Sequence, residues 1–148
     1  MNKKLYLDTS VISALFDERT PERMDMTEKA WEQIKKYDVY ISDTVVEELQ
    51  MAAAPLLDKF NNAIKDFKVL SVMDEAQELA KFHVEQEIFP LKYFDDALHV
   101  AVCSVNDIGL LLSWNFKHLV KVKTRKMVSA VNIIKDYTPV EIIAPPEL

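Results

Sequence analysis

The sequence holds a single glycine, Gly109, among 148 residues. Phosphate-binding loops of the Walker and dinucleotide types need several glycines, because the backbone must approach the phosphates closely. A nucleotide cofactor held by such a loop is therefore excluded. The sequence also has a single cysteine, Cys103, in the apolar stretch ALHVAVCSV. It cannot form an internal disulfide, so we expect a cytoplasmic protein from a reducing compartment.

Long apolar runs are also missing. No run approaches the roughly 18 residues of a membrane-spanning helix, and the short apolar stretch near the N-terminus is interrupted by Asp8. We therefore expect no membrane association and no export. With 49% hydrophobic residues, the chain is long enough for one domain with its own core, residues 1–148.

The charge of the chain is unevenly distributed. A net charge of -6 argues against a wholly basic nucleic-acid-binding protein. Residues 108–135, however, contain no Asp or Glu. The basic residues of this window that we expect to contact a nucleic-acid backbone are Lys117, Lys121, Lys123, Arg125 and Lys126. The alternative is that they form an ordinary solvated face.

Short apolar runs, which favour strands, alternate with longer helical patterns. The expected strands are 3–8, 39–42, 67–72, 110–115 and 140–145. The expected helices are 9–16, 26–36, 44–54, 55–67, 74–88, one beginning at 94, and 123–137. This alternation, with continuous apolar runs such as LLL, predicts an α/β fold in which a mostly parallel central sheet is covered on both faces, a three-layer α/β/α domain.

Ligands of such sheets bind outside the carboxyl ends of the strands, where the strand order reverses. Polar residues that end the expected strands are therefore candidates for a site. They are Asp8 after the first strand, Ser42 and Asp43 after the second, and Ser113, Trp114 and Asn115 after the LLL strand.

Two of the expected helices add acidic residues. In TVVEEL, Glu48 lies at the edge of the apolar face, whereas Glu47 lies on the far side and matches a capping box with Thr44. In FDDALHVAV, the helical periodicity places Asp95, Asp96 and His99 together on the polar side and does not choose between the two aspartates. His99 and His118 lack the spacing of a metal-binding pair, and we expect structural roles for both.

The segments LYLDTSVISALF, ISDTVVEEL, FDDALHVAV and LLSWNFKHL, in this order, resemble the PIN-domain family and its VapC-type toxin branch. The resemblance covers essentially the whole chain. It assigns the acids of the family to Asp8, Glu48 and Asp96, the last chosen over Asp95 because it directly precedes Ala-Leu. It places the hydroxyl partner at Ser10, and the last motif at Ser113 and Asn115. Asn115 is a departure from the most acidic version of that motif.

The resemblance implies a metal-dependent ribonuclease. Mg²⁺ or Mn²⁺ would be held mainly by Asp8 and Asp96, while Glu48 would bind metal or orient the attacking water. Asn115 would complete the catalytic group, with Ser10, Ser113 and Asp95 in support, and its amide would weaken a second metal site. The resemblance also implies an RNA substrate, a small antitoxin partner and a homodimer.

Other interpretations of these residues remain open. Asp95 and Asp96 could simply stabilise a helix N-terminus. Trp114 could stack on an unpaired base, although packing in the core is the simpler expectation. A phosphatase with Asp8 as nucleophile would want a second Asp where this chain has Ser10. The stronger alternative is a PIN-like module that binds RNA or protein without catalysis.

Overall fold

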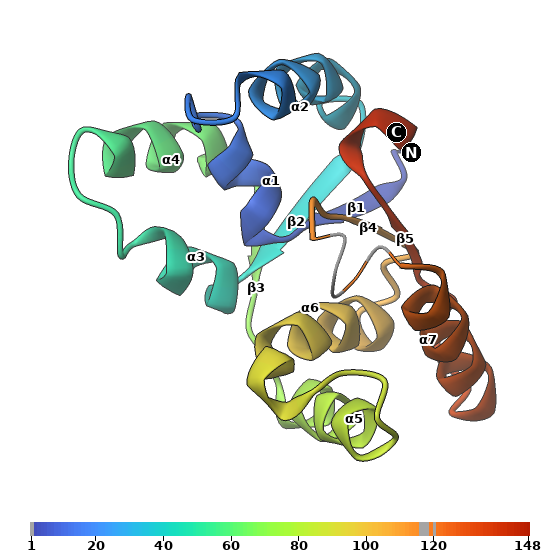
Figure 1. The fold of residues 1–148 in the computed structure, drawn as a ribbon. Helices are drawn as coiled ribbons and strands as arrows, with labels where there is room; N and C mark the ends of the chain where they lie inside the picture. Colours follow the sequence, from blue (N-terminus) through green and yellow to red (C-terminus); the bar gives the residue numbers. More distant parts are fainter. Residues whose placement is uncertain (1, 116–118, 120) are drawn as a thin grey trace.

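A parallel sheet forms the centre of the protein (Figure 1). The computed structural model describes residues 2–115, 119 and 121–148. All strands of the five-stranded sheet run parallel, in the order β3-β2-β1-β4-β5. Their bounds are β1 Lys4–Leu7, β2 Asp38–Ser42, β3 Lys68–Leu70, β4 Leu110–Leu112 and β5 Glu141–Ile143.

Helices cover both faces of this sheet, with α1, α2 and α4 on one side and α5, α6 and α7 on the other (Figure 1). The expected three-layer α/β/α architecture is therefore confirmed. The helices are α1 Thr9–Ala14, α2 Pro21–Ile34, α3 Asp43–Leu49, α4 Leu56–Ile64, α5 Asp74–Glu85, α6 Phe94–Val105 and α7 Val122–Ile134, with short 3₁₀ helices at Leu91–Tyr93 and Pro145–Glu147. None of the helices within the described ranges is long and apolar enough to cross a membrane.

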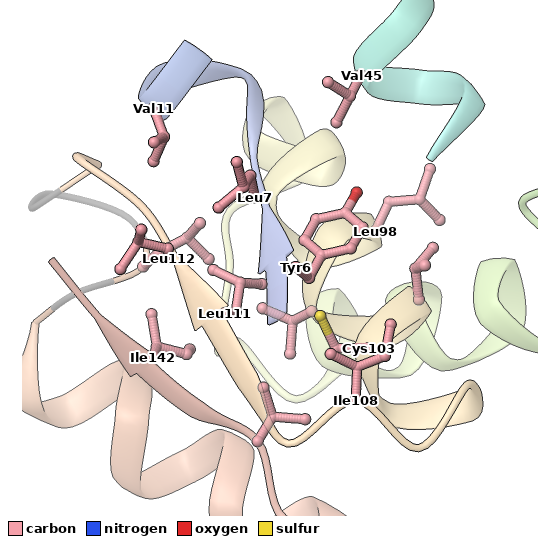
Figure 2. Packing of buried hydrophobic residues seen from close by; sticks show 14 of the residues in the cluster. Tyr6, Leu7, Val11, Val45, Leu98, Cys103, Ile108, Leu111, Leu112 and Ile142 are labelled. Atoms are coloured by element: carbon pink, nitrogen blue, oxygen red, sulfur yellow. The ribbon is translucent and has the colours of Figure 1, made fainter. Parts of the chain in front are cut away.

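The central strand β1 is buried on both faces. Leu5, Tyr6 and Leu7 have no exposed surface, and Figure 2 shows Tyr6 and Leu7 among the core side chains, with Leu111 and Leu112 of β4 beside them. Full burial of one such aliphatic side chain stabilises the fold by about 1.5–3 kcal/mol. This continuous apolar packing explains why β1 shows no alternation of polar and apolar residues.

Several predicted boundaries near the strand ends are wrong in detail. Helix α2 begins at Pro21 instead of residue 26, because proline is tolerated in a first helical turn. Helix α1 ends at Ala14 instead of residue 16, and Asp8 is its N-cap residue. The capping box of Thr44 does not form, because α3 already begins at Asp43 and its N-cap residue is Ser42.

Three helices are followed by a residue other than glycine that has a positive φ angle. Glu87, Asp107 and Asp136 follow α5, α6 and α7 with positive φ angles of 61°, 55° and 59°. The next amide along the chain bonds back into the last turn each time, for example from Ile88 to the His83 carbonyl at 3.0 Å. These are Schellman-type ends in which acidic residues occupy the left-handed position that glycine usually takes.

The strand order reverses beside β1. The chain moves from β1 to β2 and β3 in one direction and later places β4 and β5 on the other side. The carboxyl ends of β1 and β4 are neighbours, with Leu7 paired to Leu112. This is the position where open α/β sheets bind their ligands.

Candidate active site

Asp8 follows β1 directly and is 3% exposed. Its Oδ1 accepts hydrogen bonds from the backbone N–H of Ser10, at 3.1 Å, and from the Ser10 hydroxyl. Its Oδ2 accepts from the hydroxyl of Ser113, which follows β4. Asp8 therefore caps α1 and ties it to β4, so the carboxylate has little freedom to rotate.

The same two hydroxyls also hold the loop after β4. Oγ of Ser10 accepts from the backbone N–H of Trp114 at 2.9 Å, and Oγ of Ser113 accepts from that of Asn115 at 2.9 Å. Each hydroxyl thus donates to one oxygen of Asp8 and accepts from one amide of the loop. The side-chain amide of Asn115 continues the network, because Nδ2 donates to Oδ1 of Asp96 on α6 at 3.2 Å.

Glu48, on α3, approaches the site from a different element. Its Oε1 lies 3.5 Å from Nε2 of His99, which is on α6 and 3% exposed. Nδ1 of the same ring lies 2.7 Å from the Tyr6 hydroxyl, which in turn lies 2.8 Å from Oγ of Ser42. A buried polar chain therefore runs from the end of β2 through the core to Glu48.

The acids and His99 influence one another's ionisation. Burial raises the pKa of Asp8 above its ordinary value, although His99 and the two serine hydroxyls oppose this. Burial also acts to raise the pKa of Glu48. The interactions with His99 and Thr9 together lower it by more, so the pKa of Glu48 is below its ordinary value. For His99, burial acts to lower the pKa, but Glu48 and Asp8 outweigh it and leave the pKa raised.

The donor groups of the site suit a hard divalent cation. They are carboxylate, amide and hydroxyl oxygens, the ligand type that Mg²⁺ prefers. Oε1 of Glu48 is buried and accepts no regular hydrogen bond from any described residue. No group of three or more His, Cys, Asp or Glu within the described ranges forms a ready-made metal cluster. The residues therefore fit a largely hydrated ion held by one or two carboxylates, the usual way in which proteins bind Mg²⁺.

The remaining candidate residues differ in their exposure to solvent. Asp95 is exposed, next to the half-buried Asp96. Lys121, Lys123 and Lys126 are exposed at the start of α7, which follows the β4 loop. Arg125 is half-buried and pairs with Glu147 at 3.4 Å. Lys117, with Phe116 and His118, lies outside the described residues.

Trp114 is packed in the core. It is 6% exposed, its Nε1 donates to Oγ1 of Thr27 at 2.9 Å, and the Arg23 guanidinium lies 5.2 Å from the ring centroid. These contacts occupy the indole and speak against its stacking on a base.

The sequence placed His99 on the polar side of its helix and predicted only a structural role for it, whereas the structure places its ring against Glu48. His99 lies one helical turn after Asp96, so the two side chains share a face of α6, and this i, i+3 spacing was the available signal. His99 is buried while Asp96 is half-buried, because Glu48 of α3 and Tyr6 of β1 lie against the His99 ring.

Solved structures with a similar fold come from bacterial toxin-antitoxin systems. A toxin-antitoxin complex from Klebsiella pneumoniae matches with a TM-score of 0.64 at 14% identity, over 95% of this chain and 97% of that chain. VapBC2 from Rickettsia felis, bound to a promoter DNA fragment, matches with 0.59 at 12% identity, over 95% and 98%. VapC20 from Mycobacterium tuberculosis, a toxin that cleaves the sarcin-ricin loop, matches with 0.57 at 18% identity, over 78% and 93%. At these identities the likeness shows the fold.

The sequence itself carries the family assignment. No curated protein sequence matches this chain. The family model described as "PIN domain" matches residues 5–118, which include β1, the acids of α3 and α6, and the end of β4. The chain belongs to the PIN domain family.

Proposed function

We propose that this protein is a metal-dependent endoribonuclease and the toxin of a toxin-antitoxin pair. The observation that carries the proposal is the hydrogen-bonded linkage of Asp8, Ser113, Asn115 and Asp96 at the strand reversal. Glu48 is related to it through His99, which interacts with all three acids. Capping of α1 accounts for Asp8, but not for Asp96 and Glu48. A bound cation, which in turn binds a phosphodiester, would give these carboxylates a purpose.

Similar solved structures support the biological part of the proposal. Two of them belong to toxin-antitoxin complexes, and the third is a toxin that cleaves the sarcin-ricin loop. By analogy, we propose RNA as substrate, a small antitoxin as partner, a homodimer as the assembly and the cytoplasm as the location. A short reading frame next to the gene would support the proposal of an antitoxin partner.

The chemistry follows from the arrangement of the side chains. A bound Mg²⁺ or Mn²⁺ would offset charge on the scissile phosphate and lower the pKa of a bound water. Asp8 and Asp96 would hold the ion. Glu48, whose pKa is below its ordinary value, is ionised at neutral pH and would orient the attacking water or bind metal. The Asn115 amide fixes Asp96, while Ser10 and Ser113 fix Asp8.

The exposed lysines of α7 are proposed to bind the RNA backbone. Lys121, Lys123 and Lys126 are exposed near the loop that carries Asn115. Phosphate contacts of this kind supply sequence-independent, salt-dependent affinity. Lys117 and Arg125 belong to the same proposal, Arg125 after release from Glu147.

The experiment is an RNA cleavage panel. Purified protein is incubated with single-stranded RNAs, structured RNAs and a sarcin-ricin loop hairpin, with Mg²⁺, with Mn²⁺ or with EDTA. The proposal expects cleavage of at least one RNA that requires metal and stops in EDTA. Cleavage that continues in EDTA would contradict it.

One observation favours a second function, an RNA-binding or protein-binding PIN module without catalysis. Asn115 replaces an acid, and within the described ranges no cluster of three potential ligands is formed. A titration of the folded protein with Mn²⁺ separates the two functions, because the binding module does not need an ion. RNA binding without Mn²⁺ binding and without cleavage would favour the module.

A further inference from the structure

The carboxylate of Glu48 has one close polar neighbour that no part of the proposed chemistry uses, the imidazole of His99. Nε2 of His99 lies 3.5 Å from Oε1 of Glu48, and Nδ1 lies 2.7 Å from the Tyr6 hydroxyl. The Tyr6 and His99 rings are also packed together, with centroids 5.7 Å apart. Both nitrogens of the ring are thus occupied, one on the side of the site and one on the side of the core.

A neutral His99 ring would give this series of contacts one direction. Tyr6 is fully buried, and burial raises the pKa of its hydroxyl well above the ordinary value, so the hydroxyl keeps its proton. It can therefore donate to Nδ1 of His99 while accepting from the Ser42 hydroxyl. Nε2 then carries the ring proton and lies 3.5 Å from Oε1 of Glu48, an ion-pair contact outside hydrogen-bond geometry. The proton on Nε2 is present in the neutral ring and in the imidazolium alike.

We propose that His99 is a positioning residue for Glu48, held in orientation by Tyr6 and Ser42. His99 would not touch the substrate or the ion. Its N–H would direct Oε1 of Glu48, so that Oε2 faces the ion or the attacking water. This inference rests on the proposed metal-dependent function, because it gives Glu48 its task there.

The packing around Glu48 explains why its side chain would need a supporting residue. Glu48 is half-buried on the short helix α3, and its polar neighbours, His99 and Thr9, come from other elements. His99 is a suitable support because α6 is buried along most of its length and also carries Asp96. Helix α6 would therefore position both acids, Asp96 directly and Glu48 through His99. Groups that orient a ligand typically affect metal affinity about 10–100-fold when they are removed.

The test compares two amide substitutions of the same buried side chain. In His99→Gln the amide nitrogen takes the place of Nε2 and can still donate to Glu48. In His99→Asn the amide nitrogen takes the place of Nδ1 and faces only Tyr6. Mn²⁺ affinity is measured by calorimetry for both, for wild type and for Glu48→Gln, and thermal unfolding without metal confirms that each protein folds. Tyr6→Phe, which keeps the ring and loses only the hydroxyl, serves as a second variant.

We expect His99→Asn to weaken Mn²⁺ binding about 10-fold, and His99→Gln to stay near wild type. In wild type, ¹⁵N spectra of the imidazole should show the proton on Nε2, and Tyr6→Phe should disturb this tautomer and weaken binding. Equal Mn²⁺ affinity in wild type, His99→Asn and Tyr6→Phe, with a loss in Glu48→Gln, would overturn the role of His99 alone. Absence of Mn²⁺ binding in wild type would overturn both this role and the proposed metal-dependent function.

Discussion

The hydroxyl of Ser113 donates a hydrogen bond to Oδ2 of Asp8 across 105 positions of the sequence. This bond connects the carboxyl ends of β1 and β4, and the same hydroxyl accepts a hydrogen bond from the backbone N–H of Asn115 in the following loop. It is therefore a structural tie and a part of the candidate active site at once.

Replacing Ser113 by Ala should destabilise the protein. The buried Asp8 carboxylate would lose one of its donors, and an unsatisfied buried group costs about 1–3 kcal/mol. Urea denaturation of Ser113→Ala measures this loss. Ser71→Ala is the control, because Ser71 is exposed and its substitution should leave the free energy of unfolding nearly unchanged. Equal stability of the two variants would mean that the bond to Asp8 contributes little.

Much of the site was predictable because its acids follow local patterns. Asp8 ends an apolar strand, and Glu48 and Asp96 occupy helix positions that periodicity and the PIN resemblance both indicate. The sequence also predicted every strand of the sheet, since each strand is a short apolar run.

The contacts between elements were not predictable in the same way. The contact of His99 with Glu48 depends on how α3 and α6 approach each other, and no local pattern encodes that approach. Core packing of Trp114 was the simpler expectation and is observed, but its hydrogen-bond partner, Thr27 of α2, was not predictable from a local pattern.

Asn115→Asp should lower the stability of the metal-free protein and raise its affinity for metal. Its amide donates to Asp96 at 3.2 Å, so a carboxylate there would place two like charges together. We expect a lower melting temperature without metal, and a larger rise on adding Mn²⁺ than in wild type. Asn62→Asp, exposed on α4, adds the same charge away from the site and should not increase the Mn²⁺ effect. An unchanged response of Asn115→Asp to Mn²⁺ would argue against an ion at this position.

Neutralising two lysines of α7 should weaken RNA binding. In EDTA, which prevents the proposed cleavage, Lys123→Gln with Lys126→Gln should reduce affinity. The slope of log K against log salt should become shallower by about 0.7 for each phosphate of single-stranded RNA that the protein no longer neutralises. Lys36→Gln is the control, because Lys36 precedes β2 and so lies at the amino ends of the parallel strands, opposite the end that carries Asn115. If the control and the double variant bind alike, the lysines form an ordinary solvated face.

His83 should make the protein sensitive to mild acid. It has no exposed surface, and burial together with the nearby Lys135 lowers its pKa from 6.5 to about 4. Between these values the unfolded chain binds the extra proton, so stability rises with pH from about 4 to about 6.5 and is lost as pH falls through this window. At 1.36 kcal/mol per pKa unit, the shift corresponds to about 3 kcal/mol.

His83→Leu removes this titration, and neither ring nitrogen of His83 has a hydrogen-bond partner among the described residues that would be missed. The free energy of unfolding of the variant should therefore depend less on pH between 4 and 6.5 than that of wild type. Parallel pH profiles for the two proteins would show that His83 is not the group responsible.

Asp96→Asn, compared with Asp95→Asn, tests the candidate active site most directly. Both substitutions remove one charge from the first turn of α6, but only Asp96 is half-buried and bonded to Asn115. The measurement is the initial rate of Mg²⁺-dependent cleavage of the best RNA from the panel, for variants whose thermal unfolding matches wild type. We predict that Asp96→Asn abolishes cleavage and that Asp95→Asn retains it. Full cleavage by folded Asp96→Asn would contradict the proposed site.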